Sequence, residues 1–151
     1  MSDASLAETI KAAQKAAMRA RDKERTATLR LILAEFKRIE VDERVTVDDA
    51  RALAVLDKMV KQRRDSAQQY DSAGRAELAA QENAEIAVIQ EFLPAQLGED
   101  EIDAMIDAAI DASDASGMAA MGAVMGQLKP QLQGRADMGA VSQRVKAKLQ
   151  G

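Results

Sequence analysis

The chain has 151 residues, of which 47% are hydrophobic and only 2% aromatic, and its formal net charge is −4. Cysteine and histidine are both absent, which excludes disulfides, thiolate nucleophiles, imidazole bases and the usual zinc ligands. No segment reaches the length and apolar character needed to span a bilayer, and residues 1–15 lack the apolar core of a secretory signal. We therefore expect a cytoplasmic protein with no membrane partner, no metal and no cofactor.

Charge is distributed unevenly along the chain. Residues 1–75 hold 16 basic residues (Lys or Arg) and 13 acidic residues (Asp or Glu). Residues 76–111 hold no basic and 10 acidic residues, and residues 112–151 hold 5 basic and 2 acidic residues. A partner that carries phosphates would be attracted by the two ends and repelled by the middle. The pI near 5.0 is nevertheless far from that of an autonomous nucleic-acid-binding domain.

The spacing of apolar residues predicts an all-α fold with about seven helices and no strand. Ser5 and Glu8 form a capping box at the start of the first helix, and Asp22 is the N-cap of the second. The third helix follows Thr46 and ends at Gly74. A fourth helix is expected near 75–93, before Pro94. Further helices are expected near 99–112, 117–132 and 138–149, with Gly134 in a left-handed corner and Asp137 as the last N-cap. We predict a four-helix domain over residues 1–95 and a three-helix domain over residues 96–151.

The search for catalytic or metal-binding residues finds no convincing site. The glycine-containing stretch around Gly122 and Gly126 is not followed by the Lys-Ser/Thr pair of a phosphate loop, so we interpret this spacing as close helix packing. Glu99, Asp103 and Asp107 recur every four residues on one helix face, which is typical of a solvated face and not of converging metal ligands. We expect no catalytic residues in this chain.

One ion pair is predicted between the third and fourth helices. Arg63 falls on the apolar side of its helix, and Glu82 falls within the apolar stripe of the next helix. Folding the two helices back on each other about residues 72–74 places these two side chains opposite one another. We expect this pair to be structural.

Candidate RNA-binding cations concentrate at the C-terminal end. Arg144 and Lys148 lie four residues apart on one side of the last helix, and Lys146 flanks its other edge. Lys129 and Arg135 extend this surface toward the corner before that helix, where free backbone N–H groups would offer a seat for phosphate. Lys58 and Lys61, which face away from the apolar side of their helix, are further candidates.

Four blocks of sequence carry a family resemblance. They are TLRLI at 28–32, KQRRDS at 61–66, FLPAQL at 92–97 and the long closing pattern MGAVMGQLKPQLQGRADMGAVSQRVKAKL at 121–149. With this spacing over nearly the whole chain, the sequence resembles the YqeY-like family. The C-terminal half of that family resembles the tail domain of the GatB subunit of glutamine-dependent aminoacyl-tRNA amidotransferase, which contacts tRNA, and a similar module is appended to some glutaminyl-tRNA synthetases.

The resemblance implies a four-helix part followed by a three-helix part and a role near tRNA, but it supplies no active site. A carbon–nitrogen ligase activity with glutamine as amide donor would be assigned by similarity only. Two hypotheses follow: a tRNA-binding accessory protein, or an adaptor that docks on an amidotransferase or an aminoacyl-tRNA synthetase, with an undetected enzyme as a third. Because aromatic residues are scarce, RNA would be bound through the phosphates and shape of a folded RNA and not by base stacking, and DNA is not an expected partner.

Overall fold

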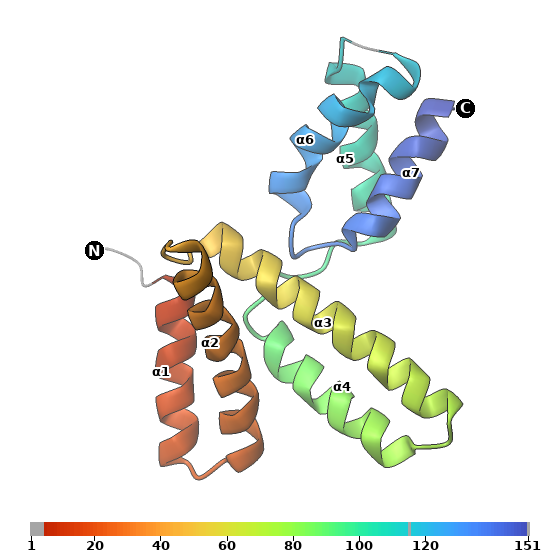
Figure 1. Cartoon of the computed structure of the whole chain (residues 1–151). Coiled ribbons are helices and arrows are strands. Elements are labelled where there is room, and N and C mark those ends of the chain that lie inside the picture. Colours follow the sequence, from red (N-terminus) through yellow and green to blue (C-terminus); the bar gives the residue numbers. More distant parts are fainter. Residues whose placement is uncertain (1–4, 115, 151) are drawn as a thin grey trace. The chain divides into compact units, whose positions relative to one another are not determined.

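The computed structural model describes residues 5–114 and 116–150, and every regular element in this part of the chain is a helix (Figure 1). The elements are α1 (Leu6–Arg19), α2 (Lys23–Glu43), α3 (Asp49–Ser72), α4 (Ala76–Gln90), α5 (Glu99–Ala112), the 3-10 helix η1 (Gly117–Ala120), α6 (Met121–Leu132) and α7 (Met138–Gln150). The predicted all-α class is therefore confirmed. The helices form two compact units, Met1–Pro94 and Ala95–Gly151, and each unit has its own hydrophobic core.

Side-chain caps fix the first helix starts. Ser5 Oγ accepts a hydrogen bond from the Glu8 N–H at 3.1 Å, and the Glu8 carboxylate accepts one from the Ser5 N–H at 3.3 Å, so the predicted capping box is confirmed. The Asp22 carboxylate accepts from the Arg25 N–H at 3.1 Å at the start of α2, as predicted.

Two predicted helix ends were wrong by a few residues. α3 begins after Asp48, whose carboxylate accepts a backbone N–H at 2.8 Å, and not after Thr46. Both residue types cap helices, but Asp caps better than Thr, and this start places Val47 in the core with 4% exposure. α4 ends at Gln90 instead of near residue 93, because the proline that follows disfavours helical backbone just before it.

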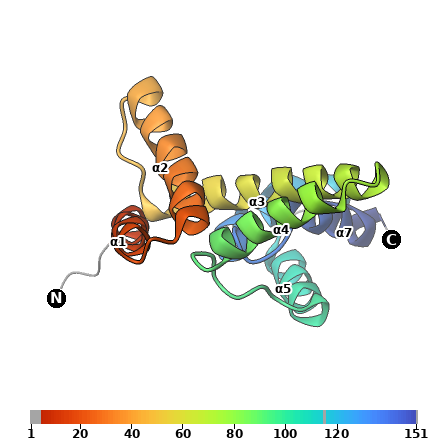
Figure 2. The same ribbon diagram turned by 90° about the horizontal axis from the view of Figure 1, so that it is seen from below.

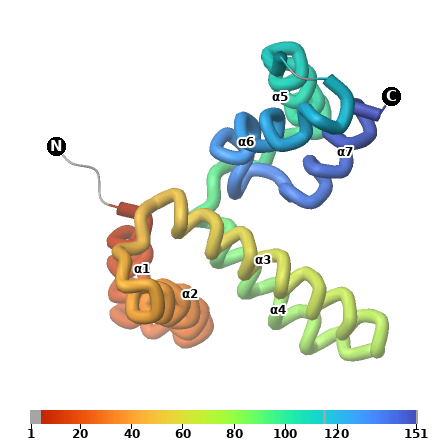
Figure 3. The backbone as a smooth tube through the Cα atoms, turned by 45° about the horizontal axis from the view of Figure 1, so that its top comes forward, coloured from red at the N-terminus to blue at the C-terminus, as the bar shows by residue number. Residues whose placement is uncertain are grey.

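Two helical hairpins make up the first unit. α1 lies beside α2 (Figure 1), and α3 lies beside α4 (Figure 2, Figure 3). The two hairpins splay apart (Figure 1). Ile10, Ile32, Leu56 and Ile89, one from each helix, are fully buried in a common core. Because α2 contributes only one side to this core, its opposite side lies in solvent along the whole helix.

The second unit encloses its core between α5, α6, α7 and η1. Ile106, Leu128 and Val145 are fully buried there. Gly134 has φ +81°, so the left-handed corner predicted between α6 and α7 is confirmed. Arg135 is the residue after Gly134, and its carbonyl accepts a hydrogen bond from the Leu97 N–H at 2.9 Å. This hydrogen bond fastens the segment before α5 to the corner.

The two glycines of α6 do not serve the close helix packing predicted for them. A Cβ atom at Gly122 or Gly126 would have no neighbour within 4 Å in the described part of the chain. Both positions are exposed. The described helices therefore make no use of the small size of these residues.

Candidate nucleic-acid interface

The seven cations predicted from the sequence fall into two groups. Lys58 and Lys61 lie on α3 of the first unit, whereas the other five belong to α6, α7 and the corner between them: Lys129, Arg135, Arg144, Lys146 and Lys148.

Arg144 and Lys148 are held by the acidic face of α5. Arg144 Nη1 lies 3.1 Å from Asp103 Oδ1, and Arg144 Nη2 lies 3.2 Å from Glu99 Oε1. Lys148 Nζ donates to Asp107 Oδ1 at 2.8 Å, and this hydrogen bond raises the pKa of Lys148. The four-residue spacing of both sets allows the cations of α7 to match the carboxylates of α5 turn by turn.

These ion pairs between α5 and α7 change the interpretation of both helices. The carboxylates at Glu99, Asp103 and Asp107, predicted to be a solvated face, remain exposed to solvent and also pair with cations of α7. A phosphate that approached Arg144 or Lys148 would compete with these carboxylates. The first role of these two cations is therefore the packing of α5 against α7.

The remaining C-terminal cations have different surroundings. Lys129 and Lys146 are exposed and have no ion-pair partner among the residues that the structure describes, whereas Arg135 is half-buried in the corner. At the start of α7 the Asp137 carboxylate accepts from the Gly139 N–H at 2.9 Å. This carboxylate already occupies part of the phosphate seat predicted there.

The first unit contains the two α3 candidates. Lys61 is exposed and, within the described ranges, has no ion-pair partner. Lys58 lies in a groove between α2 and α3, lined also by Leu31, Glu35 and Met59. A hydrogen bond from Arg38 lowers the pKa of Glu35, and the charge of Lys58 adds to this effect.

The predicted partner of Arg63 was wrong by one helical turn. Arg63 Nε donates to Glu85 Oε2 at 3.0 Å, and the two side chains are 15% and 21% exposed. The turn between α3 and α4 is centred on Gly74, which has φ +75° and lies eleven residues from both Arg63 and Glu85. A turn centred nearer residue 73 would have brought Glu82 opposite the arginine.

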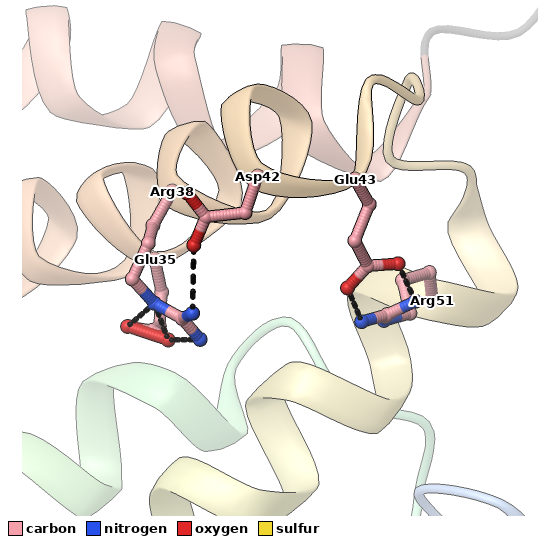
Figure 4. A network of polar contacts seen from close by, with 5 residues as sticks. All are labelled: Glu35, Arg38, Asp42, Glu43 and Arg51. Carbon is pink, nitrogen blue, oxygen red and sulfur yellow. Dashed lines mark hydrogen bonds and ion pairs between the residues drawn. The ribbon is translucent and has the colours of Figure 1, made fainter.

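A surface network near the groove was not predicted. Arg38 contacts Glu35 at 2.6 Å and Asp42 at 3.4 Å within α2, and Arg51 of α3 binds both oxygens of Glu43 at 3.0 and 2.6 Å (Figure 4). These hydrogen bonds lower the pKa of Glu35 and Glu43. The spacing of residues 35, 38 and 42 on one helix is enough to indicate the contacts of Arg38. The ion pair between Glu43 of α2 and Arg51 of α3 depends instead on the tertiary structure.

A row of cations on the outer side of α2 was also not predicted from the sequence. Lys23, Arg30, Lys37 and Arg44 are all exposed. Their signal in the sequence is a repeat of seven residues, which returns to nearly the same face of a helix after two turns. Each of the four lacks an ion-pair partner among residues 5–114 and 116–150.

The described residues contain no group of three or more side chains able to hold a metal ion. No helix in that part of the chain combines the length and apolar character required to cross a membrane.

Fold and surface thus define an all-helical protein of two small units with paired cations between helices and unpaired cations in solvent. The model of the Yqey-like protein family matches residues 7–149. The chain therefore belongs to the YqeY-like family.

Relatives were found in fungi. The chain is 28% identical over 140 residues to a Pyrenophora tritici-repentis protein named altered inheritance of mitochondria protein 41, mitochondrial, and the match covers 90% of this chain and 76% of that protein. A Vanderwaltozyma polyspora protein of the same name is 34% identical over 80 residues, which cover 52% of this chain and 43% of that one. An uncharacterised Schizosaccharomyces pombe protein is 31% identical over 77 residues, 51% of this chain and 63% of its own length.

Proposed function

We propose that this protein is a non-catalytic accessory factor that binds tRNA through the phosphate backbone and serves glutamine-dependent aminoacyl-tRNA amidotransfer. Its membership of the YqeY-like family supports the proposal, because the closing pattern at 121–149 resembles the tRNA-contacting tail of GatB. Carbon–nitrogen ligase chemistry would then belong to the partner enzyme and not to this chain. The proposal includes a cytoplasmic location.

The observation that carries the proposal is the division of the cations into two classes. Some cations, such as Arg63 and Arg144, hold carboxylates of a neighbouring helix. Lys61, Lys129 and Lys146 instead face solvent without a carboxylate partner in the part of the chain that the structure describes. Such free cations can neutralise phosphates and release counterions, which is the main source of sequence-tolerant affinity for nucleic acids.

A salt titration of tRNA binding tests this function. The chain with Lys61→Gln, Lys129→Gln and Lys146→Gln should bind tRNA more weakly than the wild type, with a log–log salt slope shallower by roughly 2 to 3. Asp103→Asn is the control, because it removes one of the two carboxylates that hold Arg144 while removing no cation, and it should not weaken binding. Failure of the wild-type chain to bind tRNA even at low salt would contradict the proposal.

The adaptor function remains a second candidate because of one apolar side chain. Leu31 is 47% exposed and lines the groove between α2 and α3, where a partner protein could cover it. Leu31→Ser should abolish co-purification of an amidotransferase or synthetase if the adaptor function is correct. Retention of the same proteins by this variant would refute a docking role for the groove.

A further inference from the structure

The outer side of α2 carries a regular row of cations. Lys23, Arg30, Lys37 and Arg44 repeat every seven residues and are all exposed. With a rise of 1.5 Å per residue, neighbouring members stand about 10 Å apart and the row extends over roughly 30 Å. The row therefore spans the helix from its first residue to its C-cap.

One carboxylate lies beside this row: Glu40 follows Lys37 by three residues and precedes Arg44 by four, so it neighbours both on the helix surface. Three other positions between members of the row, Ala27, Ala34 and Val41, are exposed and uncharged. Three other carboxylates of α2 bind arginines outside the row: Glu35 and Asp42 bind Arg38, and Glu43 binds Arg51 of α3. These ion pairs neutralise part of the negative charge of α2.

Both ends of the row carry a cation at a position where helix stability alone would favour another residue. Lys23 is the first residue of α2, where the positive end of the helix dipole disfavours a cation. Arg44 is the C-cap and has φ +56°, a left-handed conformation that suits glycine or asparagine better. The length of the row is therefore not a by-product of good helix capping.

We propose that this row is the surface on which the protein receives the phosphate backbone of a folded RNA. The inference rests on the proposed tRNA-binding function and names its principal contact. Double-stranded nucleic acid presents about one phosphate charge per 1.7 Å of axis, so each of the four cations can reach a phosphate without a fixed register. Binding through this surface is consequently tolerant of sequence.

The residues between the cations favour RNA over a lipid surface. Helices that bind membrane interfaces place large apolar residues beside their cations, but this row alternates with two alanines and one valine, Ala27, Ala34 and Val41. There is too little apolar side chain here to insert between lipids. Anionic vesicles therefore serve as a comparison in the test.

The test compares two variants that lose the same charge. The row variant combines Lys23→Gln, Arg30→Gln, Lys37→Gln and Arg44→Asn, since Gln preserves helix propensity and Asn tolerates the left-handed C-cap. The control variant changes four other exposed cations: Lys11→Gln, Lys15→Gln, Arg19→Gln and Arg64→Gln. Circular dichroism establishes that both remain helical before tRNA affinity is measured as a function of KCl concentration.

The row variant should bind tRNA at least tenfold more weakly at low salt, with a log–log slope shallower by about 3, since each lost phosphate contact removes roughly 0.7 to 0.9. The control should change much less. If the wild type binds tRNA and the row variant binds equally well, or if both variants weaken equally, the inference is overturned while the tRNA-binding function stands. If the wild type binds vesicles containing phosphatidylserine through this row but does not bind tRNA, both the inference and the proposed function fail.

Discussion

The ion pair between α3 and α4 offers the sharpest stability test of the first unit. Arg63→Met removes a guanidinium that contacts Glu85 at 3.0 Å and donates to the Met59 carbonyl at 3.3 Å. The carboxylate left behind is 21% exposed, so it keeps some hydration. Loss of one partner of a fully buried pair costs about 3–5 kcal/mol, and partial exposure reduces the expected loss here to about 2–3 kcal/mol.

The chain contains one tyrosine, Tyr70, and it lies on α3. Its fluorescence therefore reports unfolding of the first unit without interference from the second. The melting temperature of Arg63→Met should fall by roughly 10–20 °C for a unit of this size. Adding Glu85→Leu should restore part of the loss, because no unpaired charge then remains in the interface.

Glu82→Gln is the matched control for this prediction. Glu82 is the partner that the sequence predicted, and its substitution should change stability by less than about 0.5 kcal/mol. A loss for Glu82→Gln as large as that for Arg63→Met would refute the register of the α3–α4 hairpin. An undiminished loss in the double variant with Glu85→Leu would refute the explanation by an unpaired carboxylate.

Three other predictions concern pH, an exposed glycine and catalysis. Arg51 lowers the pKa of Glu43 below its ordinary value of 4.5 by hydrogen bonding. The stability that this pair contributes is therefore present above pH 4.5 and is lost as the pH falls through the lowered pKa. Glu43→Gln should destabilise the chain in urea unfolding at pH 7 but not at pH 2. Gly126→Ala should raise the stability of the second unit by about 0.5–1 kcal/mol in thermal unfolding, because its Cβ meets nothing within 4 Å, and destabilisation would reveal a close contact. The purified chain with glutamine, ATP, magnesium and misacylated tRNA should release no ammonia, and turnover that a point substitution in this chain abolishes would overturn the non-catalytic proposal.

Local signals in the sequence were sufficient for the all-α class and for several helix ends. Ser5, Glu8 and Asp22 act on backbone groups three residues away, so their roles follow from spacing alone. The start of α3 was harder, because Thr46 and Asp48 are both capping residues and only the burial of Val47 decides between them.

Contacts between helices depend on features that a single sequence does not display. The choice between Glu82 and Glu85 depends on where the turn around Gly74 is centred, and a shift of one or two residues changes the partner by a whole turn. The pairing of Arg144 with Asp103 joins residues 41 apart in sequence, which helix periodicity cannot predict. The α2 row is visible in the sequence as a seven-residue repeat, but its freedom from ion-pair partners in the described part of the chain depends on the tertiary structure.

The measurement that tests the central claim most directly is RNA cross-linking of the tagged chain in living cells, followed by identification of the RNA and of the cross-linked peptides. Our account predicts that tRNA is recovered and that the attached peptides derive from α2, Lys23–Glu43. Substitution of the cation row should remove these peptides while the protein level is unchanged. Recovery of an amidotransferase or synthetase with no cross-linked RNA would contradict the account and favour the adaptor function.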